Sequence, residues 1–397
     1  MKNLQCSYCG KKEPLVKRIF GGSHQAFICN ECIVEFFNLL EREEENRKQK
    51  DVRSHLPKPQ EIAQFLDQYV ISQEKAKMAL SVALYNHYKR ISYPKHHHIE
   101  LEKSNILLLG PSGSGKTLLA KTLARVLNIP FAMSDATALT EAGYVGEDVE
   151  SILSRLLHAA SFDIEKAQKG IVYIDEIDKI AKKGESVQSG RDIGGEGVQQ
   201  GLLKILEGAS VYVPLKGARK NSNTETVLFD TKDVLFICGG AFVGIKEERG
   251  EKRSGFLASN PSSPTQRTLR KQLLSYGMIP EFIGRIPLIL ELEPLNLESL
   301  VKILKEPKDS IIAQYQYLFS LDGVKLEFTD EALLAIAQKS LDEELGARGL
   351  RHILEEILMP LLFEIPSKEE VTQVSITQGF VLGNSEALIL EPRREDG

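Results

Sequence analysis

The feature that most constrains this fold is a buried strand that runs directly into a glycine-rich loop and then into a helix. Residues 105–109 read Asn-Ile-Leu-Leu-Leu, and Gly-Pro-Ser-Gly-Ser-Gly-Lys-Thr follows at 110–117. A helical run from Leu118 to Leu127 comes next. Glycines let backbone amides wrap phosphate oxygens, and the start of the helix adds its positive end. The segment therefore predicts a phosphate-binding loop in an α/β domain.

Each residue type in this loop has its own reason to be there. Lys116 is expected to reach the terminal phosphates of a nucleotide, and the Thr117 hydroxyl is expected to ligate Mg²⁺. The residues expected to contact the nucleotide are Pro111, Ser112, Gly113, Ser114, Gly115, Lys116, Thr117 and Leu118.

A second buried strand ends in two adjacent carboxylates. Residues 171–176 read Ile-Val-Tyr-Ile-Asp-Glu. We expect Asp175 to hold the magnesium shell and Glu176 to be the general base that activates water against the γ-phosphate. One acidic pair alone could be a solvated surface, but its combination with the phosphate loop predicts an ATPase or a GTPase. The two motifs leave open what the hydrolysis drives.

Composition narrows the class of protein. The chain has 397 residues, of which 42% are hydrophobic and 26% charged, which is typical of a soluble protein with two or three domains. The longest apolar stretch, 234–245, is interrupted by glycines and is shorter than the roughly 20 residues of a membrane span. The first residues lack the apolar core of a secretory signal, so we expect a cytoplasmic protein.

Four of the five cysteines are paired by spacing. Cys6 and Cys9 form one Cys-x-x-Cys pair, and Cys29 and Cys32 form another. This spacing is expected of a four-thiolate zinc site, which leaves no open coordination position and is therefore structural. Two redox pairs or free thiols are the alternative, and the spacing does not by itself distinguish zinc from iron.

The zinc module is followed by an apolar helix and then by a charged linker. The stretch 33–40 is more apolar than one small module can hide, which favours a self-association or partner-binding face, although core packing alone is also compatible. Ten of the thirteen residues in 41–53 are charged, five of each sign. This composition predicts a solvated linker.

Hydrophobic periodicity predicts the remaining architecture. Strands alternate with helices from about 61 to 293, which favours a three-layer α/β core with a mainly parallel sheet. After Pro294 the pattern becomes mainly helical and predicts a smaller lid domain. Helices are expected at 296–305, 307–319, 329–340 and 347–363, with short strands at 371–376 and 387–390. The expected domains are a zinc module (1–50), a linker (51–60), a large domain (61–293) and a small domain (294–397).

Further motifs give the chain a family resemblance. These are Asp-Gln-Tyr-Val-Ile-Ser-Gln-Glu-Lys-Ala at 67–76, Gly-Tyr-Val-Gly-Glu-Asp at 143–148, Ile-Pro-Glu-Phe-Ile-Gly-Arg at 279–285 and Gly-Ala-Arg-Gly-Leu-Arg at 346–351. With the four-cysteine module, the chain resembles the Clp family of AAA+ protein unfoldases over essentially its whole length. The resemblance implies an AAA+ core with a treble-clef-like zinc module, and a homohexamer that threads tagged or unfolded protein substrates, some brought by adaptors. It also implies ATP, Mg²⁺ and one structural Zn²⁺ per chain.

The resemblance assigns four further residues to the nucleotide site. Val70 and Ile71 would pack against adenine, Arg285 would act in trans on the next subunit, and Arg348 would sense nucleotide from the small domain of the same chain. Without the resemblance, ordinary core packing is an alternative for Val70 and Ile71, and a structural salt bridge is the more common role for either arginine. Ser72 replaces the family's usual glycine, and no loss of function is expected from it.

The resemblance also assigns the substrate path. Tyr144 and Val145 match the first pore loop, in which an aromatic and an aliphatic side chain grip a threaded polypeptide. Arg219 and Lys220 match the basic entrance to the pore, but Asn221 stands where the family commonly has histidine. This departure leaves the preference for C-terminal tags open.

The segment that matches the docking loop for a ClpP-type peptidase departs from the family pattern. Gly255 and Phe256 match the docking tripeptide, but Ser254 stands where an aliphatic residue is typical. An alternative function is therefore an ATP-driven protein remodeller that works without a peptidase. A nucleic-acid motor is disfavoured, because the net charge is -5 and no basic patch with interleaved aromatics is present in the sequence.

Overall fold

The computed structural model describes residues 4–12, 15–21, 26–37, 56–93, 99, 101–140, 147–182, 195–215, 226–245, 266–368 and 370–390. The chain divides into two compact units, which are treated separately below. The first consists of residues 1–56 with 88–100, and the second of residues 57–87 with 101–397.

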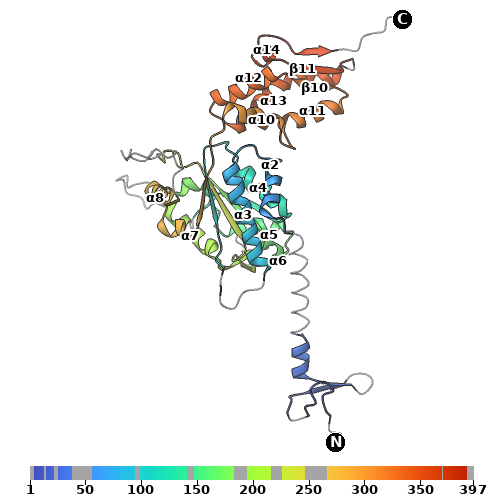
Figure 1. Cartoon of the computed structure of the whole chain (residues 1–397), viewed down its shortest axis with the longest axis vertical. Helices are drawn as coiled ribbons and strands as arrows, with labels where there is room; N and C mark the ends of the chain where they lie inside the picture. Colours follow the sequence, from blue (N-terminus) through green and yellow to red (C-terminus); the bar gives the residue numbers. More distant parts are fainter. Residues whose placement is uncertain are drawn as a thin grey trace, which may run out of the picture. The chain divides into compact units, whose positions relative to one another are not determined.

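The N-terminal module is a short hairpin followed by a helix (Figure 1). Strand β1 (Ile19–Gly21) pairs antiparallel with β2 (Phe27–Cys29), and a helix begins at Asn30 directly after β2. The buried core of this module consists of Cys6, Val16, Cys29 and Cys32. The order of a Cys-x-x-Cys turn, a hairpin that ends at Cys29 and a helix that carries Cys32 agrees with the expected treble-clef-like module.

The large domain of the second unit is built on a five-stranded parallel sheet. Its strands lie in the order β4 (Phe131–Asp135), β5 (Ile171–Asp175), β8 (Leu235–Gly240), β3 (Ile106–Leu109) and β9 (Leu288–Glu291). Every neighbouring pair is parallel. The predicted parallel sheet is confirmed, and the strand leading into the phosphate loop lies inside it.

Helices cover both faces of this sheet. They are α2 (Pro59–Asp67), α3 (Glu74–Ser92), α4 (Lys116–Leu127), α5 (Ser151–Ala159), α6 (Ile164–Ala167), α7 (Gly195–Glu207), α8 (Gln266–Tyr276) and α9 (Pro280–Gly284). Leu107 and Leu109 join a core shared with α5, α7 and α9, while Ile106 and Leu108 are buried on the opposite face. Figure 1 shows α3 on one side of the sheet and α7 on the other. The three-layer α/β fold is therefore confirmed.

A separate hairpin extends from the large domain. Strand β6 (Ser210–Pro214) pairs antiparallel with β7 (Thr226–Asp230), so that Val213 faces Val227. Val213 and Phe229 are buried and join the core of the large domain, whereas Tyr212 and Leu228 are exposed. One face of this hairpin therefore anchors it to the domain.

The small domain has its own hydrophobic core and is mainly helical. It contains α10 (Leu297–Lys305), α11 (Ile311–Leu321), α12 (Asp330–Asp342), α13 (Ala347–Glu364), α14 (Gln378–Val381) and a sheet ordered β10 (Lys325–Phe328), β11 (Gln373–Ile376), β12 (Leu388–Leu390). The predicted start of α11 at Pro307 is wrong, because the Ser310 hydroxyl accepts a hydrogen bond from the Ala313 N–H and begins the helix at Ile311. Strand β10 was not predicted.

None of the helices in the described ranges combines the length and the apolar character that a membrane-spanning segment requires.

Candidate functional site

The phosphate loop has the backbone conformation that its glycines predict. Gly113 and Gly115 have φ angles of 75° and 98°, in the region that glycine adopts without strain, and α4 begins at Lys116. The Lys116 ammonium donates to the carbonyl oxygens of Gly110 at 2.7 Å and Pro111 at 2.9 Å. The lysine side chain therefore lies along the loop whose amides would receive a phosphate.

The charge of Lys116 is destabilised where it lies. Burial lowers the pKa of Lys116, the carboxylate of Asp175 opposes this shift, and the positive charge of Arg348 adds to it. When burial lowers the pKa of a lysine, the surrounding negative charge is too small to stabilise its ammonium form. A bound triphosphate would supply that charge and restore the pKa of Lys116 toward its ordinary value.

Thr117, in the first turn of α4, is hydrogen-bonded to Asp175 at the end of β5. The Thr117 hydroxyl donates to Oδ2 of Asp175 at 2.9 Å. Two neighbouring ligands of an octahedral Mg²⁺, each about 2.1 Å from the metal, would lie about 3 Å apart. The pair thus has the donor atoms and the separation that a magnesium site requires. Oδ1 of Asp175 accepts from the hydroxyl of Tyr173, a residue absent from the predicted site although it precedes Asp175 by two positions on the same strand face.

Glu176 leaves the strand through an unusual backbone conformation. Its φ angle is 55°, and its N–H donates to Oδ1 of Asp175 at 3.0 Å. Such left-handed positions are strained for a non-glycine residue and gather at functional sites. The turn leaves the Glu176 side chain exposed beside the magnesium ligands, where a carboxylate can accept a proton from water.

The start of α13 in the small domain lies against the phosphate loop. A Cβ atom added at Gly113 would lie 2.9 Å from the Leu345 carbonyl oxygen and 3.0 Å from the Ala347 nitrogen. Arg348 is in the first turn of this helix, is exposed, and acts electrostatically on Lys116. The structure therefore brings Arg348 to the same site as Lys116, Thr117, Asp175 and Glu176.

This close approach yields a prediction for Gly113→Ala. The added methyl group clashes with the backbone of 345–347, and a positive φ adds about 1–2 kcal/mol of strain. We expect ATP affinity to fall at least tenfold in a titration with a fluorescent nucleotide. Gly115→Ala is the matched control, since its φ is also positive but nothing lies within 4 Å of the added atom. Equal losses in both variants would exclude a contribution from the contact with α13.

The segment 70–73 links the predicted adenine wall to the small domain. Val70 is buried and Ile71 half-buried. The side-chain amide of Gln73 exchanges two hydrogen bonds with the backbone of Glu293, at 2.7 and 2.9 Å, and the Ser72 hydroxyl lies 2.9 Å from that of Ser299 in α10. Ser72 has a φ of 59°, a conformation that explains why glycine suits this position. No local sequence pattern marks the role of Gln73, because its partner is 220 residues away.

Arg285 is not brought to the phosphate loop of its own chain. Its guanidinium Nε donates to Glu207 at 2.7 Å, and its carbonyl oxygen accepts from the side chain of Asn105. Asn105 precedes β3, whose opposite end leads into the loop at Gly110. At about 3.3 Å per residue these ends are about 16 Å apart, beyond the reach of an arginine side chain. Arg285 therefore does not reach a phosphate bound in the loop of its own chain.

The four predicted zinc ligands converge in the N-terminal module. The sulfur atoms of Cys6, Cys9, Cys29 and Cys32 all lie within 4.8 Å of one another. The Cys6–Cys32 and Cys9–Cys29 separations are 3.9 and 3.6 Å. Thiolates at about 2.3 Å from a tetrahedral Zn²⁺ would be about 3.8 Å apart, so the cluster fits this ion. Hydrogen bonds from the backbone, chiefly at Cys9, lower the pKa of Cys6 to about 6, whereas burial and the neighbouring thiols raise the pKa of Cys32.

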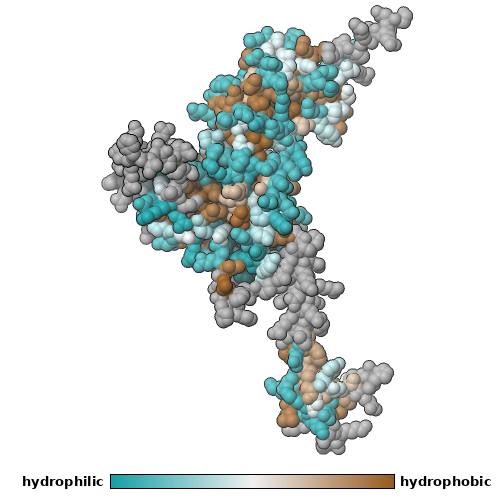
Figure 2. Space-filling model, viewed as in Figure 1, coloured by the Kyte–Doolittle hydropathy of each residue, from teal (hydrophilic) through white to brown (hydrophobic). Residues whose placement is uncertain are grey.

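The helix of this module exposes apolar side chains, as the sequence predicts. Ile33, Val34, Phe36 and Phe37 are all exposed, Phe37 by 58%. Figure 2 shows apolar residues at the surface of this module. These side chains form an exposed apolar surface that lies outside the small buried core of the module.

Six predicted site residues lie outside the described ranges. They are Tyr144 and Val145 of the first pore loop, Arg219 and Lys220 of the pore entrance, and Gly255 and Phe256 of the docking segment. In the sequence, Arg219 and Lys220 come after β6 and before β7.

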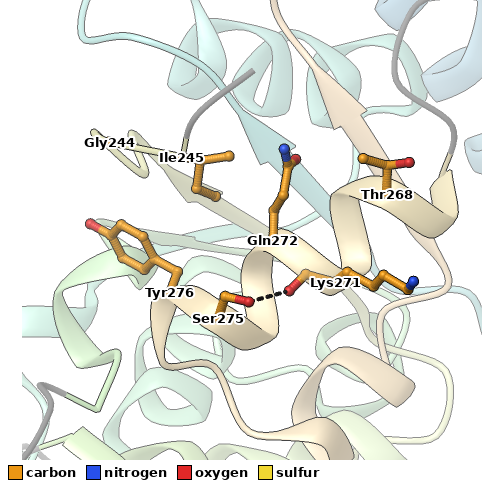
Figure 3. A pocket seen from close by; sticks show the side chains of 7 residues that line it. All are labelled: Gly244, Ile245, Thr268, Lys271, Gln272, Ser275 and Tyr276. Atoms are coloured by element: carbon orange, nitrogen blue, oxygen red, sulfur yellow. Dashed lines mark hydrogen bonds between the residues drawn. The ribbon is translucent and has the colours of Figure 1, made fainter. Parts of the chain in front are cut away.

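A hollow of about 570 Å³ lies beside α8 (Figure 3). Side chains of α8 form one wall, and the segment Gly244–Ile245 lies across from them. Its lining residues are Gly244, Ile245, Thr268, Lys271, Gln272, Ser275 and Tyr276. The hollow shares no residue with the nucleotide site, and the hydroxyl of Ser275 is already used by the carbonyl oxygen of Lys271.

Comparison with known proteins covers the three parts of the chain in order. Family models match at residues 4–42 (ClpX C4-type zinc finger), at 101–289 (AAA domain, Cdc48 subfamily) and at 295–378 (C-terminal, D2-small domain, of ClpB protein). A curated relative, the ATP-dependent Clp protease ATP-binding subunit ClpX of Borrelia duttonii (strain Ly), is 48% identical to this chain. The match covers 98% of this chain and 93% of the relative. The matched segments contain the cysteine cluster, the phosphate loop with its acidic strand, and the helix that carries Arg348.

Proposed function

This chain belongs to the ClpX family of AAA+ ATPases, and we propose that it uses ATP hydrolysis to unfold protein substrates and thread them through a ring of six identical chains. One observation carries the proposal: the phosphate loop contacts the start of α13, where Gly113 lies close to the backbone of 345–347. Because the nucleotide site touches both domains, a change in the bound phosphates can change how the domains are held. Such a movement converts hydrolysis into mechanical work.

Each residue of the site has its own role in binding or hydrolysing ATP. Lys116 and the loop amides bind the phosphates, and Val70 with Ile71 forms an apolar wall for adenine. Mg²⁺ held by Thr117 and Asp175 would neutralise the β- and γ-phosphate oxygens. Glu176 orients a water molecule and accepts its proton as it attacks the γ-phosphate. The position of the Lys116 ammonium along the loop, where burial lowers its pKa, supports its assignment as a phosphate ligand.

Two arginines complete the site from different directions. Arg348 acts from the small domain of the same chain, where its charge already acts on Lys116. Arg285 acts on the site of the neighbouring chain, which its place at the far end of β3 supports. A guanidinium offers planar, permanently charged donors to the phosphate charge that develops during hydrolysis. Arg285 therefore links hydrolysis to assembly of the ring.

Substrate handling is assigned to the loops outside the described ranges. Tyr144 and Val145 grip the polypeptide, and Arg219 and Lys220 attract its C-terminal carboxylate. The zinc module, taken as 1–50, uses its exposed apolar face to pair with another module or to receive adaptors and substrates. It is joined by a linker (51–60) to the large domain (61–293) and the small domain (294–397).

The unfolded product is delivered to a ClpP-type peptidase in the cytoplasm. Gly255 and Phe256 form the docking segment, in which Ser254 supplies less apolar area than an aliphatic residue. Each missing methylene removes about 0.8 kcal/mol of burial, so docking is weaker than in typical family members. Ser254 is also the observation that favours the second candidate function, a remodeller that acts without a peptidase.

A stable fluorescent reporter protein carrying a candidate C-terminal tag tests the proposal. The reporter is mixed with the chain, Mg²⁺ and ATP, without peptidase, and its native fluorescence is followed. Loss of fluorescence that requires ATP and is absent with Glu176→Gln supports unfolding. Steady ATP hydrolysis without loss for any of several tags contradicts it. Adding a purified peptidase then distinguishes the unfoldase that feeds degradation from the remodeller.

A further inference from the structure

The backbone around Arg285 is rigidly anchored. Arg285 directly follows α9, and its neighbours Phe282, Ile283 and Ile286 are all buried in the core of the large domain. Its N–H is hydrogen-bonded to the carbonyl oxygens of Glu281 and Phe282. The arginine therefore projects from a fixed point, and only its side chain must be directed.

The buried side-chain amide of Asn105 connects the backbone of Arg285 to the end of α7. Asn105 is 2% exposed, and its side-chain nitrogen donates to the Arg285 carbonyl oxygen at 2.9 Å and to the Leu206 carbonyl oxygen at 3.2 Å. The Asn105 Nδ2 group makes both of these bonds, whereas its Oδ1 is buried without a hydrogen-bond partner among the described residues. Breaking either bond would leave a buried donor unpaired, so both bonds resist opening. One side chain thus holds Arg285 beside the residue that precedes Glu207.

The carboxylate of Glu207 binds one edge of the Arg285 guanidinium. Its Oε1 accepts from Arg285 Nε at 2.7 Å. Within the described ranges, no other hydrogen bond or ion pair to the Arg285 side chain is found. Exposed ion pairs usually contribute little, because two mobile side chains must be ordered. Here the two backbones are already fixed by Asn105, and the outer edge of the guanidinium remains available for phosphate oxygens.

We propose that Glu207 and Asn105 are positioning residues that aim the outer edge of the Arg285 guanidinium at the nucleotide of the neighbouring chain. The inference rests on the proposed trans role of Arg285 and adds the residues that make it effective. Because the arginine stabilises charge that develops during hydrolysis, its misdirection should lower kcat and leave KM for ATP nearly unchanged.

The first test compares substitutions at Glu207. Glu207→Ala is expected to lower kcat for ATP about tenfold with less than a twofold change in KM, and Glu207→Gln, which keeps an acceptor oxygen, to recover most of the loss. Glu364→Ala is the matched control, because it removes an ion pair of similar length and exposure, to Lys368, in the small domain. An unchanged kcat in Glu207→Ala, or a change confined to KM, overturns the proposal.

The second test asks whether Glu207 acts on the next chain. Glu207→Ala chains, which have an intact site of their own, are mixed with Glu176→Gln chains, which have a silent site but a well-held arginine. ATP turnover per Glu207→Ala chain is expected to rise severalfold as the silent chains increase. Silent chains that carry both Glu176→Gln and Glu207→Ala control for dilution and should give no rise. A flat response with both kinds of silent chain overturns the proposal.

Arg285→Ala separates this inference from the function on which it rests. Mixed with Glu176→Gln chains, it should regain turnover in the same way. If it does not, the trans role of Arg285 itself is wrong. If Arg285→Ala is rescued and Glu207→Ala is not, only the positioning role fails.

The role of Asn105 is tested by a double variant. Asn105→Ala combined with Glu207→Ala should lower kcat no further than the stronger single variant, and additive losses would count against a shared role.

Discussion

Glu176→Gln is expected to bind ATP as tightly as the unchanged chain and to hydrolyse it at least a hundredfold more slowly. The substitution keeps the size of the side chain and removes its basicity, and general-base catalysis typically contributes 10²–10⁴-fold to a rate. Glu176 is exposed, and its N–H bond to Asp175 is made by the backbone, so the turn should persist in the variant. Binding and catalysis should therefore separate.

Two measurements on the same preparation check this expectation. Calorimetric titration with ATP and Mg²⁺ gives the affinity, and release of phosphate in the steady state gives the turnover. Glu165→Gln, in an exposed position of α6, controls for the loss of one surface charge and should change neither quantity. A turnover reduced less than tenfold, or an affinity that falls in parallel with turnover, would remove Glu176 from the role of general base.

The parts of the fold that the sequence predicted well are those whose burial leaves a local signal. Strands β3 and β5 are apolar at almost every position because both of their faces are covered, and the glycine-rich loop and the paired carboxylates stand at their ends. The helices α12 and α13 show an apolar periodicity that is sustained over several turns. Identification of these elements required no knowledge of distant contacts.

The missed elements depend on partners far away in the sequence. Strand β10 is four residues long, alternates polar and apolar positions, and becomes a strand only because it pairs with β11, 48 residues further on. Gln73, Asn105 and Glu207 look like ordinary polar residues in the sequence. Their roles arise from contacts with Glu293 and Arg285 that span 78 to 220 residues. Tyr173 is different, since its spacing from Asp175 already placed both on one face.

Removal of zinc is expected to unfold the N-terminal module and to leave ATP hydrolysis by the rest of the chain intact. The described core of the module contains three of the four cysteines and only one other residue, Val16. So small a core cannot offset the conformational entropy of about 40 residues. Binding of a structural zinc ion supplies about 10–16 kcal/mol in comparable modules, and that energy is lost with the ion. The second unit keeps two cores of its own.

Cys29→Ser gives the same result without a chelator and can be matched to a control. Cys29 is the last residue of β2 and is fully buried, so its loss should release the ion and expose 4–37 to limited proteolysis. Cys238→Ala removes a thiol from β8 in the other unit and should leave one zinc ion per chain, measured with a metal-binding dye. Full zinc content in Cys29→Ser would exclude the four-thiolate site. A loss of basal ATP turnover that parallels zinc loss would show instead that the module supports the nucleotide site, a coupling that the separate cores give no reason to expect.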